Sequence, residues 1–238
     1  VYKRQDFELL CKLLQLYRPT WLSDFINGDH SFYSFNLNYQ ELMQLVDLGY
    51  IKELSPKLLG QMVPWQIRIR SSNSKEEETF DSSPLLKREI TLKEHIWYVF
   101  EYESNLGYLD DCAKRAYKEG ITVQDESFSA ILYRFSLDGH LDRNRLLRAT
   151  LSTFNRSFKK DMVNWFAGLF EELQPRAEEL ISLQEEIMQV FTSPYTKPVN
   201  VMLQQLKKIA SEGGFRYQEF IERATTLFFS SPKNSLLT

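Results

Sequence analysis

The sequence predicts an all-α protein, in which antiparallel helix pairs stack into an α-solenoid with a right-handed superhelical twist. Apolar residues recur at helical spacing through most of the 238 residues, with capping residues and glycines at the ends of the segments. Phe191-Thr192-Ser193-Pro194 is echoed by Phe229-Ser230-Ser231-Pro232 about 38 residues later, a period typical of two-helix repeats. No part of the chain predicts a β-sheet of three or more strands.

Residues 1–64 are expected to form an N-terminal helical region. Apolar side chains from Phe7 to Tyr17 follow a helical period, and Pro19 ends that helix. Asn38 is suited to cap the next long helix, and Pro56 suits the first turn of another.

Residues 65–83 are expected to separate this region from the rest of the chain. Trp65 to Arg70 alternates apolar and polar side chains, which is the period of a half-buried strand. No second alternating run follows, and Ser71 to Ser83 is rich in Ser and Glu. We therefore expect an extended segment that leads into a mobile loop.

Residues 84–238 are expected to form an array of helical hairpins. Thr91 and Glu94 have the spacing of a capping box for an aromatic helix from His95 to Phe100, in which His95 would lie on the polar face. Three hairpins should follow, with these helix pairs: 125–139 with 142–154, 158–173 with 175–191, and 195–210 with 215–229. Asp125 and Asp142 are the expected N-caps of the first pair.

Two aromatic residues lie at the centre of the longest predicted hairpin. Trp165 and Phe166 both fall within the helix at 158–173, so we expect both side chains in its core. Replacing Trp165 by Ala would then cost roughly 3–5 kcal/mol.

With its capped apolar stripes at this period, the chain from Thr91 onward resembles the HEAT-repeat class of α-solenoids. The resemblance covers about two thirds of the sequence. It implies continuous edges and a groove that bind other macromolecules.

A second resemblance rests on the segments Leu137 to Arg143, Trp165-Phe166-Ala167 and Leu173-Gln174-Pro175. These segments are similar to an uncharacterised bacterial family of such solenoids, known by a domain-of-unknown-function label. Members of that family accompany MoxR-type ATPases and proteins of the von Willebrand A type. The resemblance therefore implies a scaffold role, with an ATPase-associated assembly as the protein partner.

Composition indicates a globular chain with no overall charge that would attract nucleic acid or a membrane. Hydrophobic residues make up 43% of the sequence, charged residues 26%, and the net charge is −3. The two cysteines, Cys11 and Cys112, form no CxxC pair, which favours a reducing compartment, and we expect a cytoplasmic location without a membrane partner. The chain starts without Met, and Ser231-Pro232 resembles another helix start, so we expect a piece of a longer protein.

No sequence motif predicts catalysis, a cofactor or a metal. The three histidines, His30, His95 and His140, are far apart, and Glu94-His95 lacks the second histidine of a zinc-binding HExxH helix. His140 follows Gly139 and should interact with the dipole at a helix C-terminus. Both cysteines fall in apolar helices, where a small buried thiol is the expected role.

One group of basic residues is a candidate partner-binding patch. The basic patch consists of Arg143, Arg145, Arg148, Arg156, Lys159 and Lys160. It could bind an acidic partner or nucleic acid. Alternatively, the Glu pairs of the next hairpin (Glu171, Glu172, Glu178, Glu179, Glu185 and Glu186) could face it and neutralise it on a solvated surface.

Two functions from different classes remain open. The first is a non-catalytic protein-binding scaffold, in which an edge or groove of the solenoid docks a partner. The second is a nucleic-acid-binding solenoid that resembles the HEAT-like DNA glycosylases, which grip phosphates on a concave basic surface. Because the basic residues are confined to one hairpin and carboxylates follow, the sequence favours the scaffold.

Overall fold

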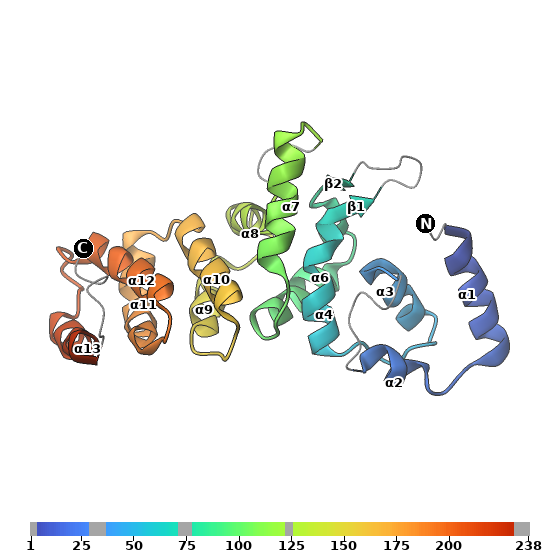
Figure 1. Ribbon diagram of the computed structural model, residues 1–238, viewed down its shortest axis with the longest axis horizontal. Helices are drawn as coiled ribbons and strands as arrows, with labels where there is room; N and C mark the ends of the chain where they lie inside the picture. Colours follow the sequence, from blue (N-terminus) through green and yellow to red (C-terminus); the bar gives the residue numbers. More distant parts are fainter. Residues whose placement is uncertain (1–3, 29–36, 71–77, 122–125, 231–238) are drawn as a thin grey trace. The chain divides into compact units, whose positions relative to one another are not determined.

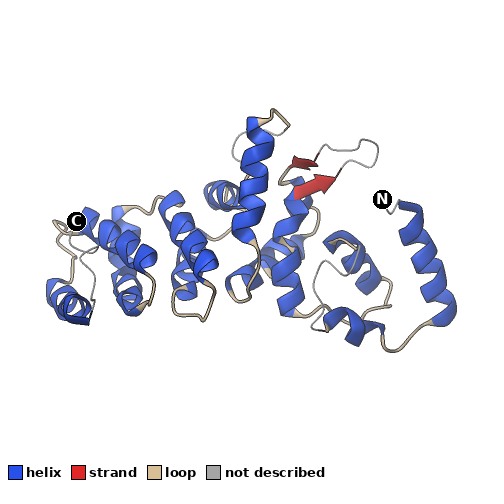
Figure 2. Ribbon diagram, in the orientation of Figure 1, coloured by secondary structure: helices blue, strands red, loops and turns tan. Residues whose placement is uncertain are grey.

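The computed structural model describes residues 4–28, 37–70, 78–121 and 126–230. The chain divides into two compact units, residues 1–131 and 132–238, which we describe separately. Figure 1 gives the order of the elements, and Figure 2 shows that the described chain is helical apart from one pair of short strands. The expected all-α class is therefore confirmed, whereas the three-part division expected from the sequence stays a prediction.

The first unit contains most of the short elements. Its helices are α1 (Arg4–Tyr17), α2 (Leu22–Asn27), α3 (Tyr39–Asp47), α4 (Pro56–Met62), α5 (Ser83–Leu86), α6 (Glu89–Lys93) and α7 (Leu106–Lys118), with the 3-10 helices η2 (Pro64–Ile67) and η3 (His95–Phe100). The strands are β1 (Arg68–Arg70) and β2 (Glu78–Phe80), and α8 (Phe128–Leu137) contains the boundary between the units.

Several helix ends follow from local chemistry that the sequence predicted. Asn38 caps α3, because its side chain accepts from the Glu41 amide while Glu41 accepts from the Asn38 amide. Ser55 caps α4 with Pro56 in its first turn. Gly49 has a φ of 74°, the left-handed conformation that ends a helix without a Cβ clash.

The segment from Trp65 to Arg70 differs from the expected strand. Pro64 begins the 3-10 turn η2, so only Arg68–Arg70 is extended, and it pairs antiparallel with Glu78–Phe80. The second strand has three residues, too few to show an alternating period in the sequence. Most of the loop that was expected to be mobile, residues 71–77, lies outside the described residues.

The region from Thr91 to Phe100 is also different from the prediction. Thr91 is completely buried within α6, and Glu94 precedes η3 without any side-chain capping bond. The expected capping box is therefore wrong. The η3 segment packs closely on α4, where an added Cβ at Gly60 would lie 2.6 Å from the Tyr98 carbonyl oxygen.

The second unit contains the predicted helices of the array: α9 (Arg143–Thr153), α10 (Lys160–Glu172), α11 (Ala177–Gln189), α12 (Thr196–Ile209) and α13 (Tyr217–Ser230), with the 3-10 helix η4 (Val190–Thr192) after α11. Asp142 caps α9 through the Arg145 amide, as expected. Asp125 lies outside the described residues, and in the first unit the buried Asp110 carboxylate accepts from the Phe128 amide at the start of α8.

Helix packing in this unit follows a pattern that differs from the predicted pairs. The sequence paired α10 with α11, but α10 packs mainly on α9 and α12, and α11 packs mainly on α9 and α12. Each of these helices thus contacts a neighbour along the chain and also the helix two positions away. A short turn brings two helices near each other but does not decide which apolar face each one buries.

The core of the second unit includes Phe166 but not Trp165. Phe166 has no exposed surface, and its ring lies 5.1 Å from that of Trp165 in an edge arrangement. Trp165 itself is partly exposed, and the cost expected for Trp165→Ala stays a prediction. Helical spacing locates an apolar stripe only to within about one residue, and Trp165 and Phe166 are adjacent, so spacing alone does not show which of the two is fully buried.

Candidate functional site

The residues of the basic patch lie on α9, at the turn that follows it and at the start of α10. Five of the six side chains are exposed: Arg145, Arg148, Arg156, Lys159 and Lys160. Arg143 is the exception, since its side chain is only 14% exposed. The structure therefore separates one structural arginine from a group of surface cations.

The guanidinium group of Arg143, on α9, bonds to α8, to α11 and to the turn after α10. It donates to Glu179 on α11 over 2.6 Å and 3.1 Å, and to the Leu173 carbonyl after α10 over 2.8 Å. It also donates to the Gln174 carbonyl and to the Ser136 hydroxyl. Carbonyl groups at a helix C-terminus lack partners within the helix, so Arg143 satisfies groups that the turn leaves open.

The charge of Glu179 is stabilised by the same contacts. Burial alone would raise the pKa of Glu179, but the hydrogen bonds from Arg143 and from the Arg176 amide, together with both positive charges, lower it. Its carboxylate also completes the start of α11 by accepting from the Arg176 amide at 2.8 Å. This ion pair is bidentate and mostly buried, unlike an ordinary surface pair.

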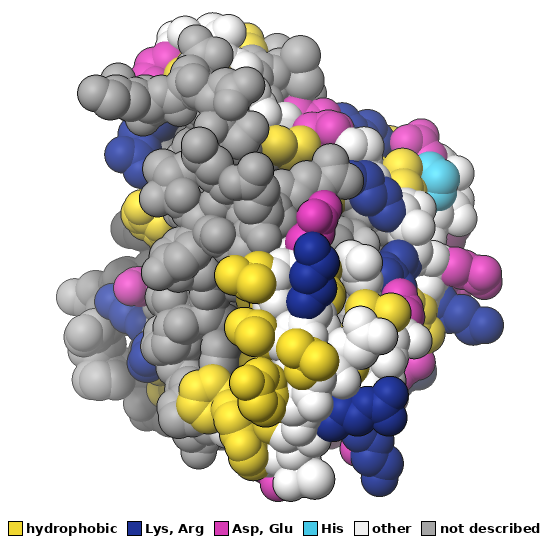
Figure 3. Space-filling view, turned by 90° about the vertical axis from the view of Figure 1, so that its right-hand side faces the viewer, with side chains coloured by type: hydrophobic (Ala, Val, Ile, Leu, Met, Phe, Trp, Pro, Cys, Tyr) yellow, Lys and Arg dark blue, Asp and Glu magenta, His cyan; other side chains and the backbone are white. Residues whose placement is uncertain are grey.

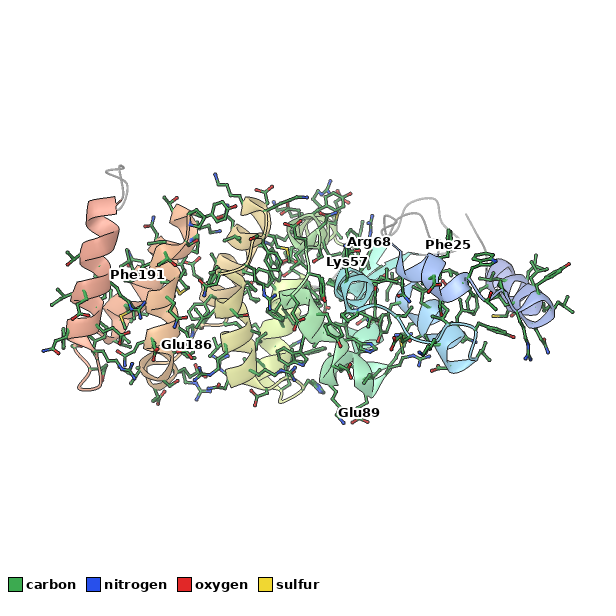
Figure 4. All side chains as sticks on the ribbon, turned by 90° about the horizontal axis from the view of Figure 1, so that it is seen from below. Phe25, Lys57, Arg68, Glu89, Glu186 and Phe191 are labelled. Carbon is green, nitrogen blue, oxygen red and sulfur yellow. The ribbon has the colours of Figure 1, made fainter. Side chains whose placement is uncertain are left out.

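A second cation of the patch also faces a carboxylate. Arg148 forms an ion pair with Glu186 on α11, which Figure 4 labels. A similar ion pair lies further along the chain, where Nη1 of Arg216 is 3.4 Å from Oε2 of Glu185. These pairs are partly neutralising contacts between α9, α11 and the segment before α13, as one of the two sequence interpretations expected.

A different surface, in the first unit, was not identified from the sequence. Helix α1 turns Phe7, Leu10, Cys11 and Leu14 inward, and Leu14 is only 6% exposed. A second apolar stripe runs along its outer side, and we call it, with the neighbouring aromatic residues, the α1–α2 face. The α1–α2 face consists of Leu9, Leu13, Leu16, Tyr17, Trp21 and Phe25, which are 44–77% exposed.

The aromatic part of the α1–α2 face is held by a well-anchored helix. Asn27 at the end of α2 donates to the Glu53 carbonyl and accepts from the Ser55 amide, while the Ser23 hydroxyl accepts from the Lys52 amide. Trp21 and Phe25 form an edge contact with ring centroids 5.7 Å apart. Figure 3 views the end of the first unit that carries α1, where hydrophobic side chains gather in a band.

The signal for this face was present in the sequence. Packing α1 against its own unit requires only one apolar stripe, but apolar residues occupy both sides of this helix. Large exposed apolar clusters on soluble proteins mark interaction surfaces, and Trp and Tyr are enriched among the residues that dominate binding energies.

A buried polar cluster lies in the first unit between α3, α6 and η3. The Tyr39 hydroxyl is 3.0 Å from Oγ1 of Thr91 and 2.7 Å from Nδ1 of His95. His95 was expected on a polar face, but it is 8% exposed, and burial lowers its pKa despite the opposing effect of Glu94. The Tyr39 hydroxyl bonds to both other side chains, so the cluster joins secondary-structure elements rather than opening to solvent.

The remaining candidates from the sequence are placed as follows. His140 is exposed, and its ring lies 5.1 Å from that of Phe135, while His30 is outside the described residues. Cys112 is buried beside the guanidinium of Arg115, and burial followed by the charge of Glu8 raises the pKa of Cys11. A raised pKa keeps a thiol protonated, which disfavours a nucleophilic role.

The described residues contain neither a metal-binding cluster nor a membrane-spanning helix. Within it, no three His, Cys, Asp or Glu side chains are placed to hold a metal ion. No helix among the described residues is long and apolar enough to cross a membrane.

Comparison with known proteins identifies a family. The family model described as "Domain of unknown function (DUF6493)" matches residues 2–234. No curated protein and no solved structure matches the chain. The match extends over both helical units and nearly the whole sequence, and the chain therefore belongs to the DUF6493 family of domains of unknown function.

Proposed function

We propose that this chain is a non-catalytic protein-interaction module, built as a HEAT-like α-solenoid and acting in the bacterial cytoplasm as part of a larger scaffold. The observation that carries the proposal is the α1–α2 face. It combines three aromatic side chains with three leucines at high exposure, anchored by the hydrogen bonds of α2. Such a surface loses little side-chain entropy on binding and offers a large apolar area.

The packing in the second unit supports the solenoid part of the proposal. Helices α9 to α12 each contact a sequence neighbour and the helix two positions away, which is the contact pattern of stacked helix pairs. A scaffold of this kind could serve an ATPase-associated assembly, which is the partner that the family resemblance implied.

The basic patch supports nucleic-acid binding less well than protein binding. Arg143 is engaged by Glu179 and by carbonyl groups, and Arg148 faces Glu186. A phosphate backbone rewards a continuous row of available cations, and carboxylates within the row reduce that attraction.

Affinity capture tests the proposal with a matched pair of variants. The tagged chain is used to capture proteins from a lysate of the source organism, and Leu16→Ser is compared with Leu86→Ser. Leu16 belongs to the α1–α2 face at 77% exposure, whereas Leu86 is a leucine on α5 at 46% exposure. We expect specific partners to be lost with Leu16→Ser and retained with Leu86→Ser, and equal loss in both variants would contradict the proposed face.

Fluorescence anisotropy with labelled duplex and single-stranded DNA tests the alternative. Replacing Arg145, Arg148 and Lys159 by Ala should change little, because we expect no tight DNA binding at physiological salt. Sub-micromolar, salt-sensitive binding that disappears in this triple variant would establish the nucleic-acid function instead, since each lost phosphate contact lowers the salt slope by about one.

A further inference from the structure

We infer that α1 pairs with the α1 of a second copy of this chain, with both helices running in the same direction. The inference rests on the proposed function, because it names the partner of the same surface. It concerns the outer stripe of α1, formed by Leu9, Leu13 and Leu16, which are 56%, 44% and 77% exposed.

The spacing of the outer stripe fits another helix. Leu9, Leu13 and Leu16 are separated by four and then three residues, which is the pattern of the seam in a two-stranded coiled coil. The opposite side of α1 already packs within its own unit through Leu14 and its neighbours. A helix that offers the same four-three pattern can interlock with this seam, and a second copy supplies such a helix.

The residues beside the seam decide the direction of the pairing. Lys12 lies along one edge of the stripe and Tyr17 along the other, and both are exposed. When the two helices run in the same direction, the edge that carries Lys12 in one copy lies against the edge that carries Tyr17 in the other, so these two side chains are close together. In an opposite-direction pair, Lys12 would face its own equivalent, and like charges repel.

The contact between Lys12 and Tyr17 is chemically favourable. A lysine ammonium is attracted to the face of an aromatic ring, and its carbon stem can cover apolar surface beside the seam. The edges of the stripe are therefore complementary to a second copy in one orientation.

The exposed area of α1 fits a weak association. The α1 residues of the face are Leu9, Leu13, Leu16 and Tyr17, and they expose on the order of 450 Å² on each copy. Stable interfaces bury about 800 Å² on each partner, so this pair is smaller than a stable interface. We expect a dissociation constant of the order of micromolar, which cellular or local concentration would make effective.

Sedimentation analysis of the purified 238-residue chain tests the pairing, over a concentration range of roughly 1–200 µM that brackets this value. Wild type should pass from monomer to dimer, and Leu13→Glu should weaken the dimer at least about tenfold, since it buries a carboxylate in the seam. Leu48→Glu is the matched control, because Leu48 is an exposed leucine of the same unit outside the face. Circular dichroism verifies that each variant keeps its helix content.

Two results would overturn the inference: a wild type that stays monomeric over the whole range, or a dimer that Leu13→Glu leaves unchanged. The same experiments distinguish a failure of the α1 pairing from a failure of the proposed interaction module. If the chain is monomeric but Leu13→Glu loses a captured protein, the interaction module stands and only the identity of the partner is wrong.

Cysteine cross-linking tests the direction. In a Cys11→Ser background, Leu16→Cys should form a disulfide-linked dimer under mild oxidation, whereas Leu48→Cys should not. A cross-link that forms only when a Leu9→Cys chain is mixed with a Leu16→Cys chain would show opposite-direction pairing and contradict the orientation.

Discussion

Arg143→Ala should destabilise the second unit strongly, although sequence spacing groups this residue with the surface cations of the basic patch. The substitution leaves the Glu179 carboxylate without its bidentate partner and removes a donor from the Leu173 carbonyl. Breaking a fully buried pair by removing one partner costs about 3–5 kcal/mol. Because the two side chains keep 14% and 19% exposure, we expect a loss of about 2–3 kcal/mol.

Hydrogen exchange measured by mass spectrometry is the suitable assay, because it reports on α9 to α11 separately from the first unit. The amides of these helices should exchange faster in Arg143→Ala. Arg156→Ala is the control, since Arg156 is an exposed member of the same patch, and we expect a change within about 0.5 kcal/mol. Glu179→Gln combined with Arg143→Ala should cost clearly less than the sum of the two single changes.

The effect should also depend on pH in a definite direction. The pKa of Glu179 is lowered from its ordinary value of 4.5, so the folded chain binds its proton less readily than the unfolded chain. The stabilisation is complete above the ordinary pKa and is lost as the pH falls through the lower folded-state pKa. The difference between wild type and Arg143→Ala should therefore shrink on acidification. A cost below about 0.5 kcal/mol at neutral pH, equal to that of Arg156→Ala, would refute the structural role of Arg143.

Three further predictions concern the packing of single residues. Gly60→Ala should lower the free energy of unfolding, measured by urea denaturation, by about 1–3 kcal/mol, because the new Cβ would lie 2.6 Å from the Tyr98 carbonyl oxygen. Gly107→Ala is the control, since Gly107 has open space around it and the change should be neutral or stabilising; equal effects of the two changes would contradict the close contact at Gly60. Gln184→Ala should cost about 1–3 kcal/mol and speed exchange around Arg216, because Gln184 bonds both the Gly214 carbonyl and the Arg216 amide; the exposed Gln204→Ala should do neither. The lowered pKa of His95 means that the unfolded chain binds a proton on this side chain more readily than the folded chain does, so the melting temperature should fall as the pH drops below about 6.5. If His95→Gln shows the same fall in melting temperature, another group is responsible for it.

The amino-acid sequence alone is enough to predict the all-α class and several helix ends. Asn38 and Asp142 act as caps at the predicted positions, Pro56 lies in the first turn of α4, and Gly139 has the positive φ expected after a helix. These features depend on contacts within a few residues, so local side-chain chemistry is enough to predict them.

Which helix faces pack together, and which side chains stay exposed, depends on the tertiary structure. Arg143 and Arg156 belong to the same basic cluster in the sequence, but only Arg143 reaches Glu179 after α11 packs on α9. His95 becomes buried because Tyr39, 56 positions earlier in the chain, bonds to its ring. The inner and outer stripes of α1 are both apolar, and only packing of the unit determines that Leu14 is covered while Leu16 stays exposed. Burial and ion pairing depend on neighbours that are distant in sequence, and a helical period cannot identify those neighbours.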